Sequence, residues 1–107
     1  HYGYRMEQMS DRHHNWLGQG ITLRNTPTEY LRSRIWYTFQ KDPIAVETRH
    51  RIGVSQLLWA SDYPHSDSTW PHSQKVIESD FDGVPDHELA AIVGTNAATL
   101  YGLTALN

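Results

Sequence analysis

The sequence predicts an α/β fold in which parallel strands alternate with helices. Two segments that favour β structure, residues 34–39 and 54–60, each follow a segment that favours a helix. The chain has 107 residues, of which 38% are hydrophobic and 11% aromatic, enough for one globular domain. The order helix, strand, helix, strand, helix, helix is typical of βα units around a parallel sheet.

Two helices are predicted before the first strand. Residues 4–16 contain good helix formers and make the first. Thr26 can cap the second helix, with Pro27 at its first position and Glu29 completing a capping box. These signals predict a short helix that ends before residue 34.

The first strand and the next helix follow directly. "RIWYTF" (34–39) alternates, so that Ile35, Tyr37 and Phe39 share one face of a strand. Asp42 and Pro43 then repeat the helix start signal, and that helix is expected to end at Gly53.

The second strand is the most apolar part of the chain. "VSQLLWA" (54–60) contains four apolar residues in succession, which predicts a strand buried on both faces. A helix is expected at about 71–79, followed by a last helix with apolar residues at three- and four-residue spacing. Asn96 interrupts that apolar stripe, which predicts a local helix break held by side-chain hydrogen bonds.

Composition argues against several classes of function. The net charge is −3 and the nine Lys and Arg residues are scattered, so we expect neither nucleic-acid binding nor binding to an anionic membrane. No apolar run approaches the roughly 18 residues of a membrane span. The chain has no cysteine, which excludes disulfides and cysteine metal sites and favours a cytoplasmic location.

Two buried parallel strands are too few to form a complete sheet. Each leaves an edge that needs a neighbour. Because the sequence also does not begin with Met, we expect it to be the C-terminal part of a larger α/β fold.

The polar segment after the second strand is the candidate site. Asp62 lies where the strand ends, which is where α/β enzymes place functional groups. A carboxylate there suits a divalent metal, although it could instead cap the following loop. The spacing of Asp62, His65, Asp67 and His72 fits no self-contained metal site, so His65 and His72 are interpreted as substrate hydrogen-bond partners or as exposed loop residues.

Two stretches carry a family resemblance. "LLWASDYPHSDSTWPHS" with "IVGTNAATLYGL" resembles the C-terminal portion of the amidohydrolase-related family. This family comprises metal-dependent TIM-barrel hydrolases and decarboxylases, including aminocarboxymuconate semialdehyde decarboxylase. "SDYPH" (61–65) and "NAATLYGL" (96–103) are the specific motifs, and the resemblance extends over essentially the whole chain.

The resemblance implies the C-terminal part of a (β/α)8 TIM barrel, with residues 1–107 as an incomplete single domain. Residues 34–39 and 54–60 would be the last two strands, and Asp62 would ligate zinc or manganese and accept a proton. A full barrel needs about 250 residues, so the family's earlier "HxH" or "ExH" ligands and strand-five histidine are expected outside this sequence. We therefore expect the 107 residues alone to be inactive.

The predicted function is that of a metal-dependent hydrolase or non-oxidative decarboxylase. Asp62 would be its catalytic and metal-binding residue, and His65 and His72 would face a small-molecule substrate. The full-length protein is expected to be a homo-oligomer. The alternative is a non-catalytic α/β module that binds a partner through an exposed strand edge and aromatic residues (Trp36, Tyr37, Phe39 and Trp59).

Overall fold

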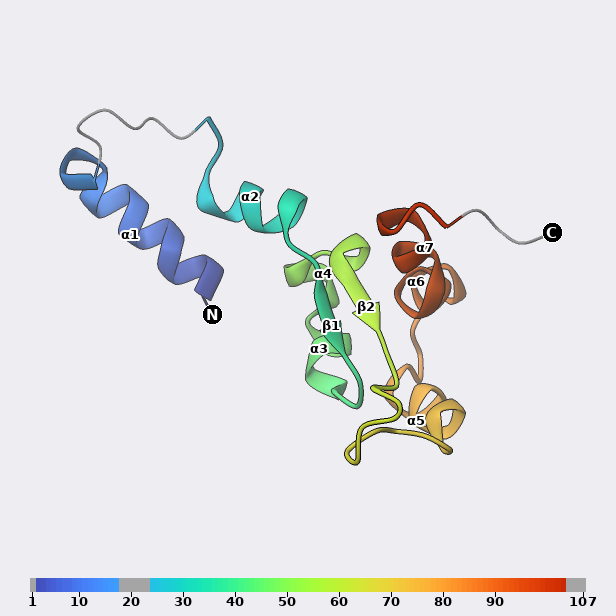
Figure 1. Cartoon of the computed structure of the whole chain (residues 1–107). Coiled ribbons are helices and arrows are strands. Elements are labelled where there is room, and N and C mark those ends of the chain that lie inside the picture. Colours follow the sequence, from blue (N-terminus) through green and yellow to red (C-terminus); the bar gives the residue numbers. More distant parts are fainter. Residues whose placement is uncertain (1, 18–23, 104–107) are drawn as a thin grey trace. The chain divides into compact units, whose positions relative to one another are not determined.

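The computed structural model describes residues 2–17 and 24–103 (Figure 1). The chain divides into two compact units, His1–Ile35 and Trp36–Asn107. A single domain over residues 1–107 stays a prediction. Within the described ranges, no helix is both long enough and apolar enough to cross a membrane.

The first unit contains the two predicted helices, of which the second begins at the predicted Pro27 and the first begins two residues before the predicted residue 4. They are α1 (Tyr2–Leu17) and α2 (Pro27–Arg34). The predicted capping box of α2 is confirmed. The Thr26 hydroxyl accepts a hydrogen bond from the Glu29 N–H at 3.3 Å, and the Glu29 carboxylate accepts one from the Thr26 N–H at 2.7 Å.

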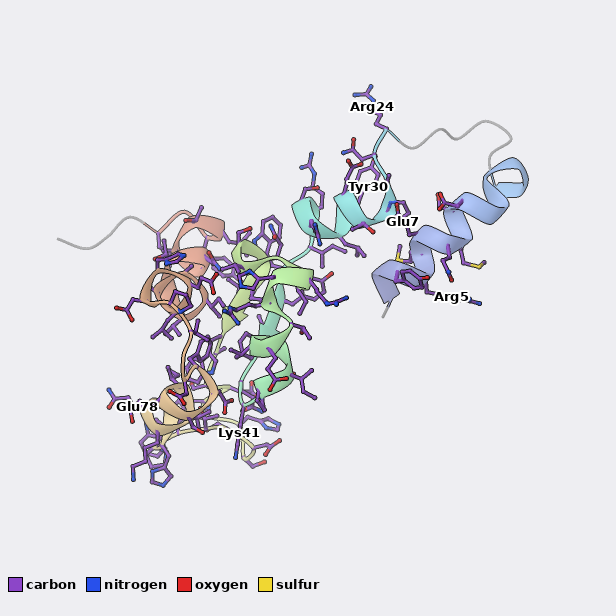
Figure 2. The ribbon with its side chains drawn as sticks, turned by 180° about the vertical axis from the view of Figure 1, so that it is seen from behind. Arg5, Glu7, Arg24, Tyr30, Lys41 and Glu78 are labelled. Atoms are coloured by element: carbon purple, nitrogen blue, oxygen red, sulfur yellow. The ribbon has the colours of Figure 1, made fainter. Side chains whose placement is uncertain are left out.

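Glu7 joins α1 to the start of α2 (Figure 2). Its carboxylate accepts hydrogen bonds from the Thr28 hydroxyl at 2.8 Å and from the Thr28 N–H at 3.0 Å. These bonds hold the pKa of Glu7 below its ordinary value, because they favour the charged carboxylate. Gly3 lets the helices approach, since a Cβ there would lie 3.0 Å from the Leu31 Cδ1.

The second unit contains a parallel pair of strands, as predicted. These are β1 (Tyr37–Phe39) and β2 (Leu57–Trp59), and Phe39 pairs with Trp59. Both strands are shorter than the predicted segments. Helix α2 continues to Arg34, and residues Val54–Gln56 form a 3₁₀ turn, η1, because pairing with a neighbour rather than local pattern decides where a strand begins.

The core of this unit lies between the strands and the helices. Leu57 belongs to a cluster of buried side chains that Phe39 and Trp59 pack against (Val46, Leu57, Phe81 and Ile92). Leu58 points to the other face of the strand, yet it is only 4% exposed. The prediction that the second strand is buried on both faces is therefore confirmed at these two leucines.

The predicted helix after β1 forms in two pieces, α3 (Pro43–Glu47) and α4 (Arg49–Ile52). Asp42 caps α3 as expected, because its carboxylate accepts a hydrogen bond from the Ala45 N–H at 3.0 Å. Gly53, with φ of 119°, ends α4 at the predicted residue. A side chain at this position would be strained by its backbone angle.

The C-terminal helices are α5 (Ser73–Asp80), α6 (Asp86–Ala90) and α7 (Asn96–Leu100). A π-helical segment, η2 (Ala91–Thr95), separates α6 from α7 and is the helix irregularity predicted near Asn96. The Asn96 amide donates to the carbonyl oxygens of Val54 at 2.7 Å and Leu57 at 2.9 Å. Asn96 therefore ties the helix irregularity to the start of β2.

A buried ion pair joins α4 to α6. The Arg49 Nε lies 2.6 Å from a carboxylate oxygen of Glu88, whose residue is only 9% exposed. The Nε2 of His50 lies 3.3 Å from the other oxygen. The hydrogen bond from Arg49 holds the pKa of Glu88 below its ordinary value, and this effect outweighs the opposite effect of burial.

Replacing Asn96 by Ala should lower the free energy of unfolding by roughly 2–3 kcal/mol, because two carbonyl oxygens lose their donor. Urea denaturation of the full protein that carries this chain measures this change. The control is Asn25→Ala, which alters an exposed asparagine. Equal unfolding midpoints for the two variants would show that the Asn96 bonds do not stabilise the fold.

Replacing Glu88 by Gln should destabilise the chain at pH 7 but much less at pH 3. A carboxyl whose pKa is lowered on folding stabilises the fold above its unfolded pKa, ordinarily 4.5, and loses that effect as pH falls through the folded pKa. Urea midpoints at the two pH values measure it, with Glu78→Gln on α5 as the exposed control (Figure 2). A pH-independent difference would contradict the assignment.

Candidate functional site

A pocket lies at the edge of the sheet where β1 and β2 both end. It has a volume of about 230 Å³ and is lined by residues from the ends of the two strands (Thr38, Phe39, Gln40, Ala60 and Asp62). The backbone pairing continues past the strands, since the Ala60 N–H donates to the Phe39 carbonyl oxygen at 2.9 Å. Parallel pairing therefore brings Gln40 and Asp62 to one site, although 22 positions separate them in the sequence.

The pocket involves the face of the sheet that points away from the core cluster. Paired residues of neighbouring strands point to the same face, and Phe39 and Trp59 pack on the core. Thr38 pairs with Leu58 on the opposite face, and Gln40 and Ala60 directly follow the last paired residues, Phe39 and Trp59. Short and polar side chains at these positions leave the space that the pocket occupies.

Asp62 has an unusual backbone conformation. Its φ is 60°, in the left-handed region, where aspartate and asparagine are found more often than most residues other than glycine. The chain turns at this residue, as the hydrogen bond from the His65 N–H to the Asp62 carbonyl oxygen at 2.8 Å shows. The Asp62 side chain is 59% exposed and lines the pocket.

Other side chains cap the loop after β2. The Ser61 hydroxyl accepts from the Tyr63 N–H at 3.3 Å, and the Ser68 hydroxyl accepts from the Trp70 N–H at 3.2 Å. The described contact of the Asp62 carboxylate is with His65, whose Nδ1 lies 3.7 Å away. The loop-capping role that the sequence left open for Asp62 thus falls to the two serines.

His65 is exposed and lies beside Asp62 but is not among the residues that line the pocket, and its Nδ1 has a second neighbour. The Asp67 N–H donates to this nitrogen at 3.3 Å, which requires Nδ1 without a proton. A protonated Nδ1 would instead favour the Asp62 carboxylate. The Nδ1 atom can therefore interact with either the Asp67 N–H or the Asp62 carboxylate, but not with both at once.

His72 is not brought to the pocket. It occupies the position before α5 and is exposed, and its side chain makes no capping bond there. Trp70 contacts Tyr63, with ring centroids 5.2 Å apart, while both side chains stay more than 60% exposed.

The metal site implied by the resemblance is not complete in residues 2–17 and 24–103. Within these ranges no three His, Cys, Asp or Glu side chains are grouped so that they could hold a metal ion. Asp62 fits the role of one oxygen ligand, because it lines the pocket and its exposed carboxylate makes no capping bond in the described loop. The remaining ligands would have to come from elsewhere.

Gln40 is a pocket residue that sequence reasoning missed. It follows β1 just as the polar segment with Asp62 follows β2, so the same strand-end rule could have identified it. Its amide oxygen is buried and has no hydrogen-bond partner among the described residues. A residue of the pocket lining therefore carries an acceptor whose hydrogen-bonding capacity the described chain does not use.

Comparisons with known proteins agree with the observed fold. The chain superposes on the 5-carboxyvanillate decarboxylase LigW of Sphingomonas paucimobilis with a TM-score of 0.79 and 23% sequence identity. The match covers 96% of this chain and 30% of the decarboxylase, so the chain spans under a third of that protein's length. At this identity the similarity shows a shared fold over the matched part. Among curated proteins there is no match.

The sequence itself identifies the family. Residues 1–103 match the profile of the family described as amidohydrolase, which includes both motifs on which the resemblance rests. Because this match extends over nearly the whole sequence, the chain belongs to the amidohydrolase family.

Proposed function

We propose that this chain is the C-terminal part of a barrel enzyme, a metal-dependent hydrolase or non-oxidative carboxy-lyase, in which Asp62 ligates the metal and accepts a proton. One observation carries the proposal. Asp62 lines a pocket at the C-terminal ends of two parallel strands, and its carboxylate makes no described capping bond in its own loop.

The barrel assignment is supported by the edges of the sheet. Among the described residues β1 and β2 pair only with each other, so each has an edge without a neighbour. Trp36 and Tyr37 are each 37% exposed, although aromatic residues in a strand usually pack against neighbours. Further strands on both edges would cover this surface, with β1 as the seventh strand and β2 as the eighth.

The metal would supply Lewis-acid polarisation of a water or of a substrate oxygen, and enzymes of this family generally depend on a divalent ion. We propose zinc or manganese, for which a carboxylate oxygen and histidine nitrogens are suitable ligands. Asp62 contributes a carboxylate oxygen as ligand and a site that holds a proton.

The two candidate reactions use that proton differently. In hydrolysis Asp62 would take a proton from the attacking water and pass it to the leaving group. In decarboxylation the carbon that loses carbon dioxide must gain a proton, which the protonated Asp62 would deliver. Both reactions need a carboxyl group beside the substrate, so the pocket is compatible with either.

The two histidines have different support as substrate-facing residues. For His65 the support is its position beside Asp62, with Nδ1 3.7 Å from the carboxylate, and its exposed ring could donate a hydrogen bond through Nε2. For His72 the proposal still rests on the sequence, because its exposed position before α5 is outside the pocket lining. A small-molecule substrate, a homo-oligomeric full-length protein and a cytoplasmic location complete the proposal.

Replacing Asp62 by Asn in the full protein that carries this chain should remove bound metal and lower turnover at least about 100-fold. Asparagine tolerates the left-handed backbone of residue 62 and keeps the shape of the side chain, so the fold should be unchanged. Metal per chain is measured by mass spectrometry, and turnover by carbon dioxide release from aromatic carboxylates and acid release from lactones and esters.

The matched control for this experiment is Asp67→Asn, which neutralises an exposed carboxylate in the same loop outside the pocket lining. It should keep metal and turnover at the wild-type level. Wild-type metal content and turnover in the Asp62 variant would reject the proposed role of this residue.

The isolated 107-residue chain should show no turnover with added zinc or manganese and should associate through its unpaired strand edges. Sedimentation and the same turnover assays check this expectation. A cooperatively folded monomer that does not respond to either metal would instead favour the non-catalytic partner-binding module.

A further inference from the structure

Gln40 has three properties that together suggest a role in ligand binding. It lines the same pocket as Asp62, it directly follows the last residue of β1, and its amide oxygen lacks a partner among the described residues. A buried acceptor without a donor destabilises the protein that contains it. A molecule that brings a donor into the pocket would remove that penalty.

The side chain can reach such a donor by a small movement. The amide oxygen is shielded from solvent, and Gln40 is one of the residues that line the pocket. The last torsion of a glutamine side chain is soft, so the amide can turn toward the pocket at little cost in free energy. An amide oxygen accepts hydrogen bonds, so the group that it binds must carry an O–H or N–H.

We propose that Gln40 is a specificity-determining residue of the Asp62 pocket, whose amide oxygen accepts a hydrogen bond from a hydroxyl or N–H group of the substrate. This inference rests on the proposed function for the presence of a small-molecule substrate and deepens it by naming a chemical feature of that substrate. The preferred substrate carries a donor close to the group on which Asp62 acts.

The inference also explains why a strand-end glutamine suits this place. A site that hydrogen-bonds a donor discriminates strongly against an analogue without it, because the buried acceptor is then left unpaired. Thr38 and Ala60 are short neighbours that leave room for the ligand. Gln40 would thus select the substrate, while Asp62 would take part in the reaction.

The experiment compares matched ligands on the full protein that carries this chain. The probes are the three monohydroxybenzoates and the corresponding methoxybenzoates, titrated by calorimetry or NMR. In each pair the two molecules share a carboxylate and a ring, and only the hydroxyl member has a donor. On the wild-type protein at least one hydroxyl member should bind about ten-fold more tightly than its methoxy partner.

Three variants assign the preference to Gln40. Gln40→Met keeps the size of the side chain but removes the acceptor. This variant should therefore bind the hydroxyl and methoxy members of a pair with about equal affinity. Gln40→Glu keeps an acceptor oxygen and should preserve the ratio of the two affinities, even if its charge weakens the binding of both ligands equally. Gln56→Met, at the opposite end of β2, should leave the ratio at the wild-type value.

Two results would overturn the inference. One is the absence of any hydroxyl preference on the wild-type protein, whether both members of a pair bind or neither does. The other is an unchanged ratio of hydroxyl to methoxy affinity in Gln40→Met. If that variant were less stable but kept the ratio, the amide would contribute to packing alone.

The outcome is separable from that of the proposed function. Loss of metal in Asp62→Asn together with an unchanged ligand ratio in Gln40→Met rejects the role of Gln40 and retains the role of Asp62. A Gln40-dependent preference in a protein whose Asp62→Asn variant keeps its metal supports Gln40 and rejects the metal-binding role of Asp62.

Discussion

The parallel pairing of β1 with β2 is the constraint on which the candidate site depends. Because Phe39 pairs with Trp59 and the backbone bonding continues to Ala60, the two chains leave the sheet at the same edge. An antiparallel pair would place Gln40 and Asp62 at opposite ends. Asn96 fixes the other end of β2 through the carbonyl oxygens of Val54 and Leu57, so a residue of the C-terminal helical run helps to hold the strand that carries Asp62.

The two faces of the strand pair serve different purposes. On one face Phe39 and Trp59 pack against the buried cluster that includes Val46 and Ile92, and burial of this apolar surface stabilises the second unit. Thr38 lies on the other face, and together with residues at the ends of the strands it lines an open pocket. At its edge Asp62 adopts a left-handed backbone angle, which costs of order 1 kcal/mol for a residue other than glycine. Such a cost is common at functional sites, where it is balanced by packing elsewhere.

Local signals in the sequence predicted local structure well. The caps at Thr26 and Asp42 depend on a few neighbouring residues, so the helix starts were predicted correctly. Strand lengths were overestimated, because pairing between distant segments decides them. The irregular helix near Asn96 was predicted, but its bonding partners, about 40 positions away, were not. Asp62 was found because a strand-end carboxylate is conspicuous, whereas Gln40 was missed because the strand-end rule was not applied to the neutral amide that follows the first strand.

The central claim is that the Asp62 carboxylate is a metal ligand, and an anomalous-difference map of the manganese-loaded full protein tests it most directly. The account predicts a manganese peak against the Asp62 carboxylate in the pocket between the ends of β1 and β2, with the other ligands supplied from outside the described residues. A manganese peak elsewhere, with Asp62 exposed to solvent alone, would contradict the account. The strand-end loop would then be a well-capped turn without a part in metal binding.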